Sequence, residues 1–332
     1  MLLSVVIPAY NIEKFILPAV RSVLSQEVES MEVIVVDDGS TDSTAEVVTS
    51  IRDDRLRLIR QANRGLAGTR NTGIRHSLGK YIAFLDGDDV WFPHKIRKQL
   101  ELMESDANLG FTYTYSAYIN ERGERSGQLW VTSVREPSFM DLIKRNHVMA
   151  SSVMARKECL LQAGLFDENL RACEDQEFWV RILYKTKYKG RLLPEVLAGY
   201  RVRADSLTLN FAHQLDNAYK VMEKFAGYIP EFTQHLKQRS MAEAYRIASR
   251  KALSEGQLQV AGQLMCESMQ LCPTIVLKDP RAFVTFLLVT FPKVLPKSCQ
   301  QIPYYWVRSL LKLFYGYFNR GCNNSINLYL EP

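Results

Sequence analysis

The sequence predicts an α/β protein, in which a sheet flanked by helices is followed by a smaller helical region. Patterns typical of strands and helices alternate over about the first 90 residues, and helical patterns fill about the last 120. Hydrophobic residues make up 47% and charged residues 23% of the chain, values that are typical of a folded globular protein. Because 332 residues exceed the usual size of one domain, we expect two domains.

Four apolar runs near the amino terminus predict strands, and helical patterns lie between them. The strands are expected at residues 3–7, 31–36, 56–59 and 81–85. The helices are expected at 13–25, at 66–77 and, capped by Thr41 or Asp42, up to residue 51. This alternation of buried strands with helices predicts a parallel sheet joined by right-handed crossovers.

Polar residues follow each of these strands at its carboxyl end. Because ligands of open α/β sheets bind beyond the carboxyl ends of the strands, we expect these four loops to meet over one edge. The loops hold Pro8 and Tyr10, Asp37 and Asp38, residues 63–65, and residues 86–88.

The fourth strand ends in Asp86-Gly87-Asp88-Asp89. Three carboxylates this close repel one another by roughly 1 kcal/mol or more per pair, and a hard divalent cation usually offsets such repulsion. Asp86 and Asp88 lie two residues apart, so their side chains leave an extended chain on the same side. The alternative is a solvated turn before a helix that begins near Pro93.

The other loops carry groups that suit a nucleotide diphosphate. Asp37 or Asp38 can accept hydrogen bonds from a base or a ribose, Tyr10 offers an aromatic face, and Arg64 and Arg70 can pair with phosphate oxygens. Taken singly, the aspartates are as consistent with helix caps, and the arginines with solvated charges. Suitable chemistry on four loops together favours a nucleotide site with a metal.

Five motifs follow one another along about residues 3–210. They are SVVIPAYN (4–11), VDDGSTD (36–42), NRG (63–65) with RNTG (70–73), FLDGDD (84–89) and EDQEFW (174–179). In kind and order they resemble the motifs of glycosyltransferase family 2. The resemblance implies the GT-A fold, which is a Rossmann-like mixed sheet flanked by helices. It also implies a nucleotide-sugar donor, a divalent cation (Mn2+ or Mg2+) and inversion at the anomeric carbon. The catalytic domain would span 1–210, with a donor-binding half at about 1–90 and an acceptor half at about 91–210.

Carried over residue by residue, the resemblance makes Asp38 a contact of the base and Asp88 a metal ligand, with Asp86 nearby. Asp175 becomes the catalytic base, with Glu174 beside it. Both acids begin a predicted helix, 174–184, so the macrodipole favours them regardless of function and should keep the pKa of Asp175 low. The donor-binding residues expected are Pro8, Tyr10, Asp37, Asp38, Arg64, Arg70, Asn71, Asp86, Arg201 and Arg203.

One position departs from the pattern of the family. After a strand expected at 196–200, the family often has an arginine followed two residues later by a histidine, whereas here Arg201 is followed by Arg203. A guanidinium cannot ligate a metal, but it can pair with a diphosphate. The rest of the acceptor half is expected to hold a hairpin of 111–119 and 128–132, helices at 138–146 and 157–164, and a strand at 148–153.

The region 211–332 is expected to be helical. Residues 242–273 resemble one tetratricopeptide-like unit, and a simple helical hairpin fits them equally well. An amphipathic tail at about 303–320 predicts either a docking helix or an interfacial helix on a membrane. The basic residues of 282–332 (Lys293, Lys297, Arg308, Lys312, Arg320) against Glu331 give this segment a charge of +4 of the chain's +6.

The sequence predicts a cytoplasmic protein, peripheral on the inner face of the membrane if the tail binds lipid. The six cysteines are scattered, no basic leader precedes the first strand, and the apolar run 282–291 is too short to span a bilayer. The function expected is transfer of a sugar to a hydroxyl of a glycan, a lipid-linked or a small-molecule acceptor, in cell-surface polysaccharide or glycolipid synthesis, without a nucleic-acid partner. The alternatives are a sugar nucleotidyltransferase, although no glycine-rich phosphate loop is present, and a non-catalytic scaffold that acts through the helical tail.

Overall fold

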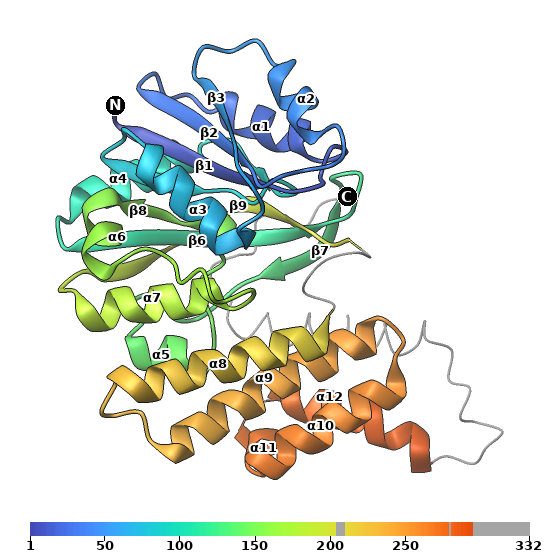
Figure 1. Cartoon of the computed structure of the whole chain (residues 1–332). Helices are drawn as coiled ribbons and strands as arrows, with labels where there is room; N and C mark the ends of the chain where they lie inside the picture. Colours follow the sequence, from blue (N-terminus) through green and yellow to red (C-terminus); the bar gives the residue numbers. More distant parts are fainter. Residues whose placement is uncertain (204–209, 279, 295–332) are drawn as a thin grey trace. The chain divides into compact units, whose positions relative to one another are not determined.

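The computed structural model describes residues 1–203, 210–278 and 280–294, and its chain forms two compact units, Met1–Ser206 and Leu207–Pro332 (Figure 1). The predicted tail at 303–320 lies outside the described residues.

The first unit is built on one mixed sheet, as the family resemblance implied. In the described residues it has nine strands in the order β3-β2-β1-β4-β8-β6-β9-β5, and β7 pairs with β6 at the side. The strands are β1 (Leu3–Ala9), β2 (Met31–Asp37), β3 (Leu56–Arg60), β4 (Tyr81–Phe84), β5 (Val90–Trp91), β6 (Leu109–Ile119), β7 (Arg125–Trp130), β8 (Met154–Arg156) and β9 (Lys189–Arg201).

The first four strands are parallel, which confirms the crossovers predicted for this half. Strand β8 then runs antiparallel to both β4 and β6, and β6 is parallel to β9. Because β1, β2 and β4 are parallel neighbours, their carboxyl ends lie at the same edge.

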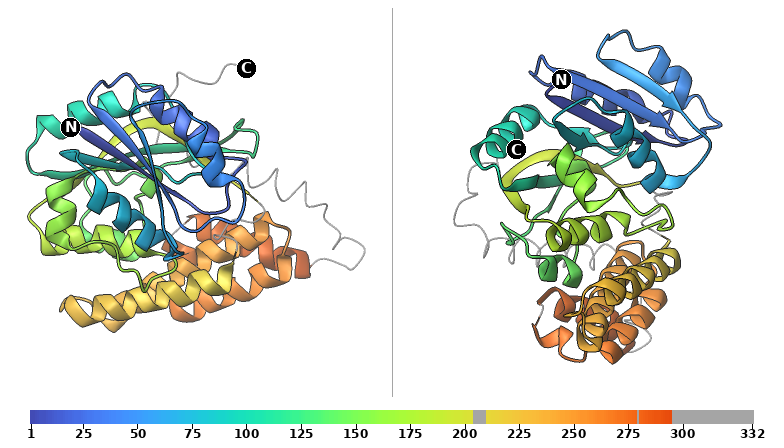
Figure 2. Two further views of the ribbon diagram at one scale, coloured as in Figure 1. Left: turned by 45° about the horizontal axis from the view of Figure 1, so that its top comes forward. Right: turned by 60° about the vertical axis from the view of Figure 1, so that its left-hand side comes forward.

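Helices cover both faces of this sheet (Figures 1 and 2). On one face, the side chains of Leu3, Val5 and Ile7 share a core with α1 and α4. On the other face, α3 lies so close to β1 that a Cβ at Gly73 would come within 2.3 Å of Val6, so only glycine fits there. The helices of this unit are α1 (Ile16–Leu24), α2 (Thr44–Thr49), α3 (Gly65–His76), α4 (Lys95–Ser105), α5 (Phe139–Lys144), α6 (Lys157–Ala163) and α7 (Glu174–Lys185).

Aromatic side chains fix α7 against the sheet. Trp179 is fully buried, with its ring 5.5 Å from that of Phe111 and 6.3 Å from that of Phe84. Phe166, from the loop before α7, meets the Trp179 ring edge-on at 5.9 Å. Such pairs add roughly 0.5–1.5 kcal/mol each beyond the area they bury, so the first turn of α7 has a defined position.

The strand predicted at 148–153 is wrong. Residues Ala150–Ser152 form a 3-10 turn, and β8 begins only at Met154. The hydroxyl of Ser152 donates to the Met149 carbonyl oxygen, and the Ser151 carbonyl oxygen accepts from the Trp91 indole. The Ser152 bond is local and competes with strand pairing, as serine side chains often do.

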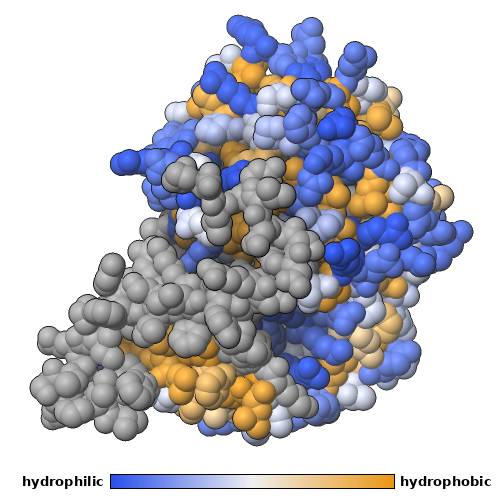
Figure 3. Space-filling model, turned by 180° about the vertical axis from the view of Figure 1, so that it is seen from behind, coloured by the Kyte–Doolittle hydropathy of each residue, from blue (hydrophilic) through white to orange (hydrophobic). Residues whose placement is uncertain are grey.

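The second unit is helical in its described residues. Its helices are α8 (Phe211–Tyr228), α9 (Gln234–Ser254), α10 (Leu258–Leu271), α11 (Ile275–Lys278) and α12 (Pro280–Val294). The residues of the predicted hairpin, 242–273, lie on α9 and α10, where Ser249 and Ser268 each donate a 2.7 Å hydrogen bond to the facing helix. Figure 3 shows apolar side chains gathered on this unit, and Phe283 and Leu287 of α12 are exposed. No helix in the described ranges is long and apolar enough to cross a bilayer.

Candidate functional site

The loops that follow β1, β2 and β4 meet at one edge of the sheet, as predicted. The backbone N–H of Asp38 donates to the Ala9 carbonyl oxygen at 2.9 Å, and that of Gly87 donates to the Pro8 carbonyl oxygen at 3.2 Å. A Cβ at Gly87 would stand 2.8 Å from the same Pro8 oxygen, so this position requires glycine. The backbone of Pro8 therefore holds the loop that carries Asp86 and Asp88. The Tyr10 side chain, two residues further along the chain, is 50% exposed.

The two aspartates after β2 hold neighbouring loops in place. The Asp38 carboxylate accepts from the Gln61 side chain at 2.6 Å and from the backbone N–H groups of Arg64 and Gly65 at 2.9 and 2.8 Å. Asp37, fully buried, accepts from the backbone N–H of Ser40 and from the Arg60 guanidinium. A carboxylate has about four acceptor positions, and three of those of Asp38 are filled by these protein groups, so its contact with a base stays a prediction.

Asp86 and Asp88 are the open carboxylates of the site, each with 28% of its side chain exposed. Asp86 accepts from the Arg70 guanidinium at 2.7 Å, and Asp88 pairs with Arg203 at 3.1 Å. Burial and the neighbouring Asp86 raise the pKa of Asp88 to about 6. The two carboxylates repel each other, and a bound cation would offset that repulsion.

The third acid of the motif, Asp89, has a structural role. It is almost fully buried, and its carboxylate accepts from the backbone N–H of Arg201 at 2.8 Å. Burial and the nearby Asp88 raise the pKa of Asp89 well above its ordinary value. Asp89 thus ties the loop to the end of β9.

Arg70 joins the Asp86 loop to α7. Its guanidinium is buried, and it donates to Asp86 and, at 2.5 Å, to the Glu174 carboxylate, 104 residues further along the chain. Burial alone would lower the pKa of Arg70, but Asp86, Glu174 and Asp175 raise it, so the group stays charged. The sequence predicted that Arg70 can pair with the donor phosphates. In this structure its terminal nitrogens bind these two carboxylates, and a contact with a donor stays a prediction.

Asp175 is less buried than Glu174 and is held differently. Its side chain accepts from the Asn146 amide at 3.0 Å and from the backbone N–H of Gln176 at 2.7 Å. Burial, followed by the Glu174 charge, raises the pKa of Asp175 to about 7, against the lowering effect of Arg70 and of these hydrogen bonds. The expectation of a low pKa was wrong, because it considered only the helix dipole.

Asn71 and Arg64 point to the loop before α7. The Asn71 amide accepts from the Phe166 N–H and donates to the Phe166 carbonyl oxygen and to Glu168, all at 2.9 Å. Arg64 donates to the same Glu168 carboxylate at 2.5 Å. Both residues hold the loop that leads to Asp175, and their predicted contact with the donor stays a prediction.

The two arginines after β9 both serve the Asp88 loop. Arg201 is buried and donates to the carbonyl oxygens of Asp88, Asn120 and Glu121 at 2.6–2.8 Å. Arg203 meets the Asp88 side chain, and both guanidinium carbons lie 5.1 Å from the centre of the Phe15 ring.

Three further residues of the site carried no signal in the sequence. Asn146 orients Asp175, Glu168 receives Asn71 and Arg64, and the hydroxyl oxygen of Ser151 accepts from the Asp86 N–H at 3.1 Å. Each comes from a segment that sequence patterns predicted as helix end, loop or strand interior.

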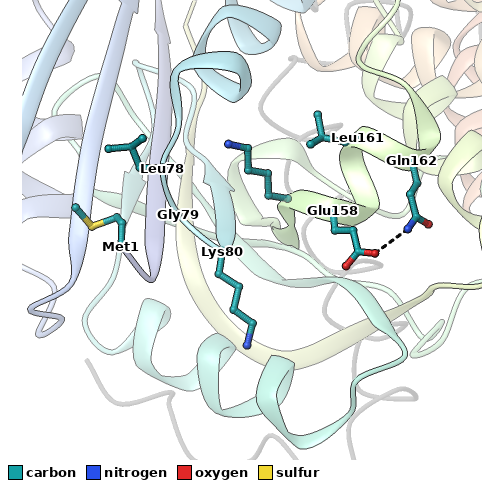
Figure 4. Close-up of a pocket in the computed structure, with 8 residues that line it drawn as sticks. Met1, Leu78, Gly79, Lys80, Glu158, Leu161 and Gln162 are labelled. Carbon is teal, nitrogen blue, oxygen red and sulfur yellow. Dashed lines mark hydrogen bonds between the residues drawn. The ribbon is translucent and has the colours of Figure 1, made fainter.

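A separate hollow of about 690 Å³ lies at the opposite edge of the sheet (Figure 4). Its lining includes Met1 and residues 78–80, which precede β1 and β4, together with Glu158, Leu161 and Gln162 of α6. It is therefore distinct from the site at the carboxyl ends of the strands.

Among the described residues, no group of three or more histidine, cysteine or acidic side chains is arranged to hold a metal. Asp86 and Asp88 would supply two oxygen ligands. They fit a cation that a bound diphosphate helps to coordinate, which is how Mg2+ is commonly held.

Comparisons with known proteins agree with these observations. The family model described as "Glycosyl transferase family 2" matches residues 4–160. Over 225 residues the chain is 32% identical to the Escherichia coli UDP-Glc:alpha-D-GlcNAc-diphosphoundecaprenol beta-1,3-glucosyltransferase WfaP, covering 67% of this chain and 86% of that protein. The chain spans only about a third of the length of three other curated relatives, which are uncharacterized glycosyltransferases of Rickettsia.

Solved structures with low identity show the same fold. The S. aureus TarS fragment in complex with UDP-GlcNAc superposes with a TM-score of 0.61 at 18% identity, covering 88% of this chain and 91% of that chain. The Pyrobaculum calidifontis mannosyltransferase PcManGT, in complex with GDP-Man and Mn2+, superposes with a TM-score of 0.57 at 19% identity, covering 96% of this chain and 86% of that one. The mixed sheet is thus the GT-A-like sheet that the resemblance implied. On its motifs, its family match and its similarity to a relative that it covers almost completely, the chain belongs to glycosyltransferase family 2.

Proposed function

We propose that this protein is an inverting glycosyltransferase that moves a sugar from a nucleotide-diphosphate donor to an acceptor hydroxyl. The observation that carries the proposal is the link through Arg70 between Asp86 and Glu174, the residue next to Asp175 on α7. It connects the loop of Asp86 and Asp88, which can bind a cation, with the helix of Asp175, which can accept a proton. Inverting transfer needs both functions.

Asp175 is the proposed base. With a pKa of about 7 it is partly deprotonated at neutral pH, so it can take the proton of an acceptor hydroxyl as that oxygen attacks the anomeric carbon. Glu174 is committed to Arg70, which makes it a positioning residue for its neighbour.

Asp88 and Asp86 are the proposed ligands of a divalent cation, Mn2+ or Mg2+. When bound, the cation would supply positive charge that stabilises the leaving nucleoside diphosphate. Asp38, Asp37 and Tyr10 line the part of the edge that we assign to the nucleoside. Arg203 lies nearest the phosphates in this assignment.

The substrates are proposed from relatives. The name of WfaP gives UDP-Glc as its donor and a diphosphoundecaprenol-linked sugar as its acceptor. TarS binds UDP-GlcNAc and PcManGT binds GDP-Man with Mn2+. We therefore propose a nucleotide-sugar donor and a lipid-linked or glycan acceptor, in cell-surface polysaccharide or glycolipid synthesis. The competing sugar nucleotidyltransferase would release pyrophosphate instead.

A panel of UDP- and GDP-sugars, each with MnCl2 or MgCl2, tests the proposal. We expect cation-dependent binding and slow release of the nucleoside diphosphate for at least one donor. Asp88→Asn should abolish transfer and weaken that binding while the protein stays folded, and Asp54→Asn, an exposed aspartate away from the site, should match the wild type. Pyrophosphate as the product, or normal turnover by Asp88→Asn, would overturn the assignment.

A further inference from the structure

Arg203 forms an ion pair with Asp88, the carboxylate that we propose as a ligand of the cation. The nitrogen and oxygen are 3.1 Å apart, and the two side chains are only 12% and 28% exposed. A pair this sheltered is screened less than a surface pair, so it persists in the absence of ligand.

The neighbouring Arg201 does not share this role. It donates to three backbone carbonyl oxygens, one of them that of Asp88 itself, and those bonds build the loop. Arg203 instead meets the carboxylate, beside the Phe15 ring, at the outer end of β9.

A guanidinium and a divalent cation on the same carboxylate repel each other, so a cation binds Asp88 more weakly while Arg203 holds the Oδ2 atom of Asp88. A diphosphate, however, is a stronger partner for Arg203 than one carboxylate, since it offers several charged oxygens to the planar fork.

We propose that Arg203 covers Asp88 in the free protein and moves to the diphosphate when the donor binds, which opens Asp88 to the cation. The inference rests on the proposed function and adds an order to it, in which nucleotide binding prepares the metal site. The cation alone then binds weakly, and the coupling between cation and nucleotide depends on Arg203.

Two binding measurements on the full chain test this exchange. The first titrates MnCl2 without nucleotide and follows free Mn2+ by its paramagnetic resonance signal. The second titrates UDP and GDP in EDTA by calorimetry. In Arg203→Gln we expect Mn2+ affinity to rise roughly fivefold or more, because the competitor is gone. We expect cation-free nucleotide affinity to fall roughly tenfold, because a charged hydrogen-bond donor is lost.

Two further variants separate the explanations. Arg203→Lys keeps the charge but not the fork, so Mn2+ affinity should stay near wild type while nucleotide affinity falls. Arg122→Gln removes an exposed arginine of the 120–124 turn and should change neither quantity. If Arg203→Gln fails to fold, the nucleotide titration of Arg203→Lys still tests the proposal, and an unchanged nucleotide affinity in Arg203→Lys overturns it.

The proposal is overturned if Arg203→Gln binds Mn2+ like the wild type, since Arg203 then does not compete for Asp88. It is also overturned if Mn2+ affinity rises while nucleotide affinity is unchanged, since Arg203 is then a fixed counter-ion. Failure of the proposed function looks different, because the wild type would then bind neither nucleotide even with Mn2+.

Discussion

Replacing Asp175 with asparagine should lower the transfer rate by roughly a hundredfold or more while leaving donor and cation binding nearly unchanged. Asparagine has the same shape and retains one oxygen, which can accept either from Asn146 or from the Gln176 N–H, since these two groups donate to different oxygens of Asp175. It cannot accept the proton of the acceptor hydroxyl. The loss should therefore appear in the rate at saturating donor and acceptor.

The pKa of Asp175 gives this prediction a second signature. Burial and Glu174 raise the pKa of Asp175 to about 7, so the carboxylate is half deprotonated near neutral pH. Deprotonation is lost as pH falls, so between pH 8 and pH 6 the wild-type rate should fall by roughly tenfold, following the fraction of the basic form. In Asp175→Asn the midpoint near pH 7 should disappear, and any fall that remains near pH 6 belongs to Asp88, whose pKa is raised to about 6.

Glu174→Gln is the matched control, because it changes the adjacent acid by the same chemistry. It should reduce transfer less, and it should move the midpoint of the pH profile downward, because the Glu174 charge raises the pKa of Asp175. Initial rates across pH 5.5–8.5, with donor binding measured separately, give both quantities. A nearly active Asp175→Asn beside an inactive Glu174→Gln would reverse the two roles, and two active variants would place the base elsewhere.

Three other predictions concern the buried charges and the tail. Arg70→Met should lower the free energy of unfolding by roughly 3–5 kcal/mol in urea titrations, because it leaves two carboxylates of a buried network unpaired, and an effect below 1 kcal/mol would contradict the bridge. Burial lowers the pKa of Lys95 well below its ordinary value, so the protein takes up a proton when it unfolds and its free energy of unfolding should rise from pH 7 toward pH 10. In Lys95→Met this rise should be smaller. A rise equal to that of the wild type would mean that Lys95 is charged in the folded protein. If residues 303–320 bind lipid, the protein should sediment with anionic liposomes at low salt and be released by high salt, and equal recovery in the supernatant with and without liposomes would remove that interpretation.

The strand ends and their loops could be predicted from the sequence because both are local patterns. The run 81–85 reads as a strand, and Asp86-Gly87-Asp88 follows it directly, so the meeting of the loops followed from parallel topology alone. The family resemblance assigned a role to each of these residues, which no single motif does.

Side-chain partners far apart in the sequence could not be predicted. Arg70 reads as a free cation near a helix start, and nothing local indicates Glu174 or Asp86 as its partners. For the same reason the pKa of Asp175 was misjudged, since burial and Glu174 outweigh the dipole of α7. The strand predicted at 148–153 was wrong because a pattern of apolar residues does not indicate which hydrogen bonds the Ser151 and Ser152 hydroxyl groups make.

Helix α3 also sets the spacing of the site. Its first residue, Gly65, donates its N–H to Asp38, and five residues later Arg70 holds Asp86 and Glu174. Five steps along an α-helix advance about 7.5 Å, and a hydrogen-bonded helix changes that length very little. Helix α3 therefore fixes the distance between the backbone that binds Asp38, at the proposed nucleoside end, and Arg70, at the proposed reacting end. The length of donor that fits between these two ends then depends on a rigid helix and not on flexible loops.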